Sequence, residues 1–142
     1  MTEISPDALV GAWRLVAIES TDEAGAVSHP FGPDPSGQLI YQPNGRMSAQ
    51  LVRSARTRCV SEDNVAATDS EAVAAWRGYV GYFGTFSVDA SAGTVTHHVE
   101  GAWFPNFEGR DQIRSCRLDG NRLELGGPTP YGMTRISWER IA

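Results

Sequence analysis

The chain is poor in the residues that metal centres, disulfide frameworks and membrane spans require. It has two cysteines and three histidines among 142 residues, and Cys59 and Cys116 stand far apart, in no metal-binding spacing. No stretch approaches the roughly 20 apolar residues that cross a bilayer. The first seven residues lack the basic and apolar parts of a signal peptide. We therefore expect a cytoplasmic protein with reduced thiols, no metal and no membrane partner.

The net charge and the absence of known catalytic motifs exclude further classes of function. The net charge of −5 argues against a nucleic-acid partner, which would need a basic face. No nucleophile elbow, P-loop or dinucleotide fingerprint is present, so we expect no nucleotide or redox cofactor. Hydrophobic residues make up 41% and charged residues 20% of the chain. This composition indicates a globular protein, and the length predicts one domain over residues 1–142.

Short strand-like runs separated by tight turns dominate the sequence. The clearest turn is Pro43-Asn44-Gly45, because Asn-Gly accepts the positive φ angles of a hairpin turn. Eight strands joined mostly by short turns predict an antiparallel meander that can close into an all-β barrel. The predicted strands span residues 13–20, 38–41, 46–52, 82–88, 94–100, 112–118, 122–125 and 133–140.

One substantial helix is expected to flank this barrel. Thr68 and Glu71 have the spacing of a capping box and precede apolar residues at helical intervals, which predicts a helix over 69–79. Its Trp76 face is expected to pack on the barrel or across its mouth. Residues 53–67 have no regular pattern, so they form a lid or binding loop or are partly disordered. The arginines at 53, 56 and 58 form a small basic cluster that we expect to be solvated.

Several segments resemble a known family over nearly the whole chain. The start Gly11-Ala12-Trp13 resembles the G-x-W motif of lipocalins and the wider calycin barrels, in which an arginine near the end of the barrel packs over the tryptophan. Arg140 is placed for that role. The runs 41–48, 82–86, 93–101 and 104–106 resemble the bacterial and fungal lipocalin-like domain family. The resemblance implies an eight-stranded antiparallel lipocalin-like (calycin) barrel with one flanking α-helix.

Strand alternation predicts which side chains face the interior. In the hairpin of residues 82–100, Phe86 lies opposite His97, and this more apolar face points inward, so His98 points outward. The same argument places Gln112, Arg114, Cys116 and Leu118 inside. Along the first strand it selects Trp13, Leu15, Ala17 and Glu19; along the strands of the Asn44-Gly45 hairpin it selects Leu39, Tyr41, Met47, Ala49 and Leu51; and along the last strand it selects Ile136, Trp138 and Arg140.

Three interior side chains are candidate catalytic residues. His97 can act as a general acid or base or orient a ligand carbonyl, and the alternative is a core histidine bonded to a neighbouring hydroxyl. Tyr82 can donate a hydrogen bond to a ligand oxygen, or it can simply pack in the core. Arg114 can bind a carboxylate or stabilise an enolate, unless it pairs internally with Glu19 or Asp111.

Aromatic side chains supply the candidate ligand-binding residues. The segment 103–107 either closes the barrel mouth over a ligand, with Asn106 offering its amide, or plugs the barrel end with Phe104 and Phe107. The candidate ligand-binding set is Tyr41, Trp76, Phe86, Trp103, Phe104, Asn106, Tyr131 and Trp138.

Two functions fit a mostly apolar cavity with a few polar groups. The first is a cofactor-independent cyclase or isomerase that acts on a polyketide- or terpenoid-like intermediate in secondary metabolism, because several lipocalin-like barrels are cyclases. The physical basis would be a rigid pocket that aligns a flexible chain. The second is a non-catalytic binding or carrier protein for an apolar ligand, and a third option is an interaction protein with a solid core. The sequence leaves a homodimer open.

Overall fold

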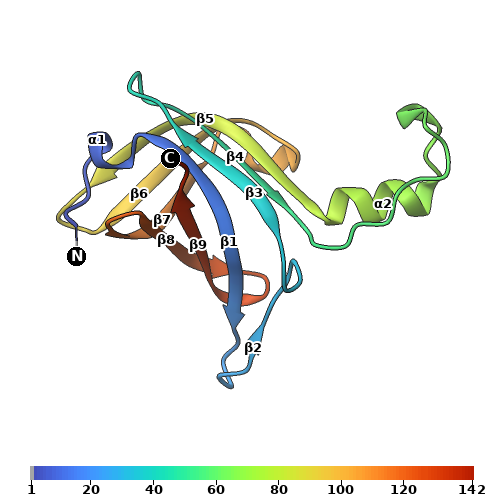
Figure 1. Cartoon of the computed structure of the whole chain (residues 1–142), viewed down its shortest axis with the longest axis horizontal. Helices are drawn as coiled ribbons and strands as arrows, with labels where there is room; N and C mark the ends of the chain where they lie inside the picture. The colour runs from blue at the N-terminus through green and yellow to red at the C-terminus, as the bar shows by residue number, and fades with distance from the viewer. Residues whose placement is uncertain (1) are drawn as a thin grey trace.

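The strands of the protein close into a barrel, as Figure 1 shows for the computed structural model, which describes residues 2–142. Strand β1 pairs with β3 on one side and with β9 on the other, and each remaining neighbour along the chain pairs antiparallel. The eight-stranded barrel is therefore confirmed, and the short strand β2, which was not predicted, only extends one end of β1. The strands are β1 (Gly11–Thr21), β2 (Val27–Ser28), β3 (Ser36–Tyr41), β4 (Arg46–Val52), β5 (Tyr79–Asp89), β6 (Thr94–Ala102), β7 (Asp111–Asp119), β8 (Arg122–Thr129) and β9 (Gly132–Arg140).

One end of the barrel is closed by tight turns and by helix α1 (Pro6–Leu9). Trp13 is fully buried there, and its indole Nε1 donates to the Leu9 carbonyl at 2.9 Å. The Arg140 guanidinium lies 4.2 Å from the centroid of the Trp13 ring. It also donates to the carbonyls of Val10 and Ala8, each at 2.8 Å. The expected tryptophan–arginine pair is confirmed, and it fastens α1 to the last strand.

The predicted inward faces are correct in most strands. Phe86 lies opposite His97, and Cys116 lies opposite Leu125. All five residues selected in β3 and β4 are buried. The hydrophobic core therefore lies inside the barrel, where residues 2–142 contribute twenty buried hydrophobic side chains to one cluster.

The second half of β1 corrects the sequence prediction. The register shifts between Leu15 and Ala17, so that one extra residue is inserted opposite β9. Such a bulge reverses the alternation beyond it. Ile18 and Ser20 are therefore buried in place of the expected Ala17 and Glu19. Glu19 points outward and pairs with Arg135 at 3.0 Å.

The helix α2 (Asp69–Arg77) does not lie along the barrel wall, which was one of the two positions expected for its Trp76 face; Trp76 instead lies 6.0 Å from Trp103, between ring centroids. The helix projects away from the barrel beyond the strand ends of β4 and β5 (Figure 1), and none of its residues is buried. The predicted capping box of Thr68 and Glu71 is present. The helix ends at Arg77, and Tyr79, the last residue of the predicted helix, begins β5. We call residues 53–78 the arm; its first part folds back along α2 and includes the turn η1 (Asn64–Ala66).

Candidate functional site

A buried histidine between two tyrosines is the most unusual polar feature of the barrel interior. His97 is 1% exposed, and both of its ring nitrogens have a phenolic partner. Nε2 lies 2.6 Å from the hydroxyl of Tyr41, and Nδ1 lies 2.7 Å from the hydroxyl of Tyr82. The three residues come from β3, β6 and β5, so barrel closure brings together side chains that are distant in the sequence. We call Tyr41, His97 and Tyr82 the relay.

Burial keeps all three groups of the relay uncharged at neutral pH. It lowers the pKa of His97 to about 3, with a further contribution from the positive charge of Arg114. Burial raises the pKa of Tyr82 to about 12 and holds the pKa of Tyr41 well above its ordinary value. A general acid or base works best with a pKa near the working pH. The relay is therefore poorly suited to proton transfer and well suited to hydrogen bonding.

The number of protons in the relay determines which hydrogen bonds it can make to a ligand. A neutral imidazole carries one N–H donor and one acceptor nitrogen. One tyrosine therefore donates to His97, and the other accepts from it. The accepting hydroxyl keeps its own hydrogen, and within residues 2–142 neither hydroxyl has a second partner. The interior thus holds one unused O–H donor in an apolar setting, where an acceptor such as a carbonyl oxygen would satisfy it.

Arg114 lies on the same side of the barrel without a carboxylate partner in the part of the chain described. Its Nη2 donates to the side-chain oxygen of Gln112 at 2.8 Å, and Nη1 donates to the carbonyl of Ile113 at 3.2 Å. The ion pairs considered for it do not form, because Glu19 binds Arg135 and Asp111 binds His98. Gly127 leaves room for it, since a Cβ there would lie 3.3 Å from Nη1.

The aromatic segment at the open end of the barrel stacks as a plug. The turn η2 (Pro105–Phe107) places Phe107 edge-on to Tyr82 at 6.4 Å between ring centroids. Trp103 contacts Phe107 at 5.4 Å, and Trp76 of α2 contacts Trp103 at 6.0 Å. Phe104 lies within 6.1 Å of Trp76. This arrangement agrees with the plug expectation, and it links the relay to the arm through aromatic contacts.

The other candidate residues are not all brought together. Phe86 stacks on Tyr41 at 4.5 Å, and Trp138 is buried in the core. The indole N–H groups of Trp138 and Trp103 have no hydrogen-bond partner in the described chain. Asn106 and Tyr131 are exposed, and Tyr131 lies in the turn between β8 and β9. Sequence reasoning missed the contact of Tyr41 with His97, since no local pattern joins two strands that are not neighbours in the sheet.

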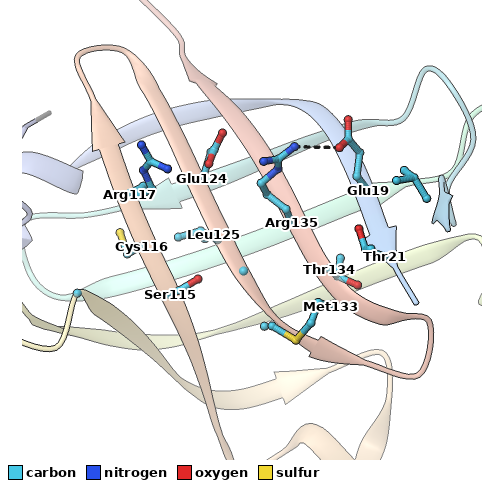
Figure 2. A pocket seen from close by; sticks show the side chains of 14 residues that line it. Glu19, Thr21, Ser115, Cys116, Arg117, Glu124, Leu125, Met133, Thr134 and Arg135 are labelled. Atoms are coloured by element: carbon cyan, nitrogen blue, oxygen red, sulfur yellow. Dashed lines mark hydrogen bonds and ion pairs between the residues drawn. The ribbon is translucent and has the colours of Figure 1, made fainter. Parts of the chain in front are cut away.

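The two pockets that stand out on the molecule lie outside the relay. The larger, about 690 Å³, crosses β7, β8, β9 and β1 (Figure 2). It follows one row of the sheet in which Ser115 pairs with Gly126 and Arg135 pairs with Glu19, so its charged side chains face outward. The second, about 450 Å³, lies on the arm. Neither of these two pockets is lined by Tyr41, His97 or Tyr82.

Residues 2–142 contain neither a metal-binding cluster nor a helix that could cross a membrane. Among residues 2–142, no group of three or more histidine, cysteine or acidic side chains could hold a metal ion. Within the same part of the chain, neither α-helix has the length and hydropathy needed to cross a membrane.

Comparison with solved structures gives distant similarities. A Schistosoma mansoni fatty acid binding protein in complex with arachidonic acid is 10% identical and has a TM-score of 0.45, covering 98% of this chain and 100% of that one. Fatty-acid-binding protein 1 of Echinococcus granulosus is 11% identical with a TM-score of 0.45, covering 96% and 99% of the two chains.

Comparison with sequences gives a clearer relationship. A 4'-hydroxy-3'-methoxypropiophenone carrier protein of Aspergillus oryzae is 34% identical over 96 residues, which is 63% of this chain and 86% of that protein. The model of the lipocalin-like domain family matches residues 10–139. This match runs from the start of β1 into β9 and confirms the family indicated by the sequence motifs. The chain belongs to the lipocalin-like domain family.

Proposed function

We propose that the protein binds and carries a small apolar molecule with a carbonyl oxygen, and that it does not transform this molecule. The unused hydroxyl hydrogen of the relay carries the proposal. A buried donor without a partner costs about 1–3 kcal/mol, and a ligand carbonyl would recover that cost. The surrounding aromatic rings, such as Phe86 and Phe107, would contact the apolar part of the ligand.

The family relationship supports the choice of a carrier over an enzyme. The Aspergillus oryzae relative is named as a carrier of an aromatic ketone. An aromatic ketone combines an apolar ring with one carbonyl acceptor, which is the chemistry that the relay would recognise.

The pKa values of the relay favour a carrier over the predicted cyclase or isomerase. His97, with its pKa near 3, is a weak base, and the phenols of Tyr41 and Tyr82 stay protonated. The predicted catalytic roles of His97, Tyr82 and Arg114 stay predictions. The positive charge of Arg114, which acts on both His97 and Tyr82, would also act on the bound oxygen.

The test compares a ketone with its analogue that lacks the carbonyl. Isothermal titration calorimetry measures binding of 4'-hydroxy-3'-methoxypropiophenone and of the propyl compound in which CH₂ replaces C=O. We expect the ketone to bind at least about tenfold more tightly. The double variant Tyr41→Phe/Tyr82→Phe should abolish this preference, because it removes the free hydroxyl donor in either tautomer of His97. Tyr131→Phe is the matched control, because Tyr131 is 58% exposed. Equal affinity for the two compounds would refute the proposal.

A second measurement separates carrying from catalysis. The ketone is incubated with the protein and recovered for mass spectrometry and NMR. We expect the compound to be unchanged. A product that forms with the wild type and is absent with His97→Gln would instead establish the cyclase or isomerase.

A further inference from the structure

The second pocket of the molecule lies on the arm and is lined by four arginines. Its volume is about 450 Å³, and it lies between residues 53–58 and the helix α2. The whole chain carries a net charge of −5, so four positive charges in one hollow are a local reversal of sign. The arginines are Arg53, Arg56, Arg58 and Arg77.

These positive charges are not balanced by nearby carboxylates. No ion pair of residues 2–142 includes any of the four arginines. Glu71 is the one carboxylate in the lining. Its two oxygens already accept hydrogen bonds from the backbone N–H groups of Thr68, at 2.8 Å, and Val60, at 2.9 Å. The pocket therefore holds an excess of positive charge that an anion would balance.

Two of the guanidinium groups are held in place by neutral partners. Arg53 donates through Nη1 to the carbonyl of Pro30 at 2.7 Å. Arg56 donates to the carbonyl of Ala75 at 3.3 Å and lies 5.5 Å from the centroid of the Tyr79 ring. A guanidinium has five N–H donors, so each of these arginines keeps several for a ligand. Fixed guanidinium groups lose less entropy on binding than mobile ones do.

The backbone between these two arginines is strained. Ala55 has a φ of +54°, and among residues 2–142 it alone has a positive φ without being glycine. Ala55 also lines the pocket. A left-handed alanine is unfavourable and persists only where the surroundings fix it, which is common at binding sites. The strain is a second feature that coincides with the arginine cluster.

We propose that the arm pocket binds a phosphate group carried by a small soluble molecule. Arginine binds phosphate through paired N–H···O bonds, and a dianionic phosphate matches a cluster of unpaired guanidinium groups. The pocket is separate from the relay, so this proposal stands independently of the function proposed above.

The test uses inorganic pyrophosphate as the probe and the full chain as the protein. Calorimetry at low salt should give measurable binding to the wild type. The double variant Arg56→Ser/Arg58→Ser should weaken it at least about tenfold, because it removes charge-assisted hydrogen bonds. Arg110→Ser/Arg122→Ser is the matched control: both arginines are exposed, lie outside the pocket and change the net charge equally. The control should bind as the wild type does.

Two further measurements locate the bound pyrophosphate and distinguish a soluble phosphate from a lipid headgroup. In ¹H–¹⁵N spectra, pyrophosphate should shift the amide of Gly78, which is buried and lines the pocket, and leave the barrel strands unshifted. Vesicles of phosphatidylglycerol in phosphatidylcholine should not bind through Arg56 and Arg58. Absent binding, equal loss in both double variants, or binding to vesicles without binding to pyrophosphate would each overturn the proposal.

Discussion

At the scale of single residues, burial decides the chemistry of the polar groups inside the barrel. The strand alternation was enough to place His97 inside, since Phe86 and Val95 on the same face are apolar. It could not indicate that both ring nitrogens would be occupied by tyrosine hydroxyls, because Tyr41 lies on β3, which does not pair with β6. A hydroxyl partner for His97 was one of the two alternatives that the sequence left open, and the structure identifies the partners as Tyr41 and Tyr82.

The pH dependence of stability should report the buried His97. Its pKa is about 3 in the folded chain and near 6.5 when unfolded, so the unfolded chain binds an extra proton below pH 6.5. The neutral imidazole therefore makes its full contribution to the free energy of unfolding above pH 6.5, and this contribution is lost as the pH falls toward 3. Between about pH 8 and about pH 5 the free energy of unfolding should fall by about 2 kcal/mol.

Urea denaturation of wild type and His97→Gln tests this prediction. The variant lacks the titrating group, so its free energy of unfolding should change by about 2 kcal/mol less over the same interval. His98→Gln is the control, since His98 lies on the outer face and contacts Asp111. Parallel curves for wild type and His97→Gln would contradict the pKa argument.

The side chain of Arg140 should contribute far more to the free energy of unfolding than an arginine in an exposed ion pair does. Arg140→Ala removes two hydrogen bonds to carbonyls and the stacking on Trp13, which should cost about 2–4 kcal/mol in urea unfolding. Arg14→Ala breaks an exposed pair with Glu139 and should cost about 0–1 kcal/mol. Similar losses in the two variants would show that the guanidinium does not fasten α1 to the barrel.

At the scale of elements, turns and caps were readable from the sequence, but the bulge and the position of the helix were not. Asn44-Gly45 and the Thr68–Glu71 box act locally, so a few residues are enough to identify them. The bulge after Leu15 has no local signature, because it depends on how β1 fits against β9. Trp76 at helical spacing indicated a packed face, and its ring does lie against Trp103 and Phe104, but the sequence did not indicate that the helix would project from the barrel.

Because α2 has no buried residues, its stability should be separable from that of the barrel. Thr68→Ala removes the N-cap and should cost the helix about 1 kcal/mol. Hydrogen exchange in residues 71–78 should speed up accordingly, while the free energy of global unfolding changes by less than about 0.5 kcal/mol. Thr57→Ala is the control, because Thr57 is exposed and lies on the arm outside α2. A loss of global stability equal to the local loss would mean that the arm unfolds together with the barrel.

At the scale of the whole molecule, pairing of β1 with β9 leaves the barrel without a free edge along its eight strands. Composition and turn spacing predicted this closure, since eight short antiparallel strands remove their edges by joining. They could not predict where the two pockets lie. The positions of the pockets depend on rows of outward-facing residues, such as the row through Gly126, and on the path of the arm.

The two thiols should respond differently because the barrel is closed. Both are free, but Cys116 is buried and its pKa is raised by burial to about 11, whereas Cys59 is half-buried on the arm. Iodoacetamide at pH 8 should label Cys59 in the native protein and label Cys116 only as urea unfolds the barrel. Mass spectrometry of peptides measures both sites, with Cys59→Ser as the control. Equal native labelling rates would indicate that the barrel opens locally near β7.

The neutral imidazole between two phenols would widen the range of ligands that the relay can hydrogen-bond. Moving the imidazole proton from one ring nitrogen to the other exchanges the roles of Tyr41 and Tyr82, so each tautomer presents one donor and one acceptor hydroxyl. Under the proposed function a ketone would use the donor, and the alcohol formed from it by reduction would use either hydroxyl. The relay would therefore accept a compound both before and after a change in its oxidation level, by a shift of one proton on His97.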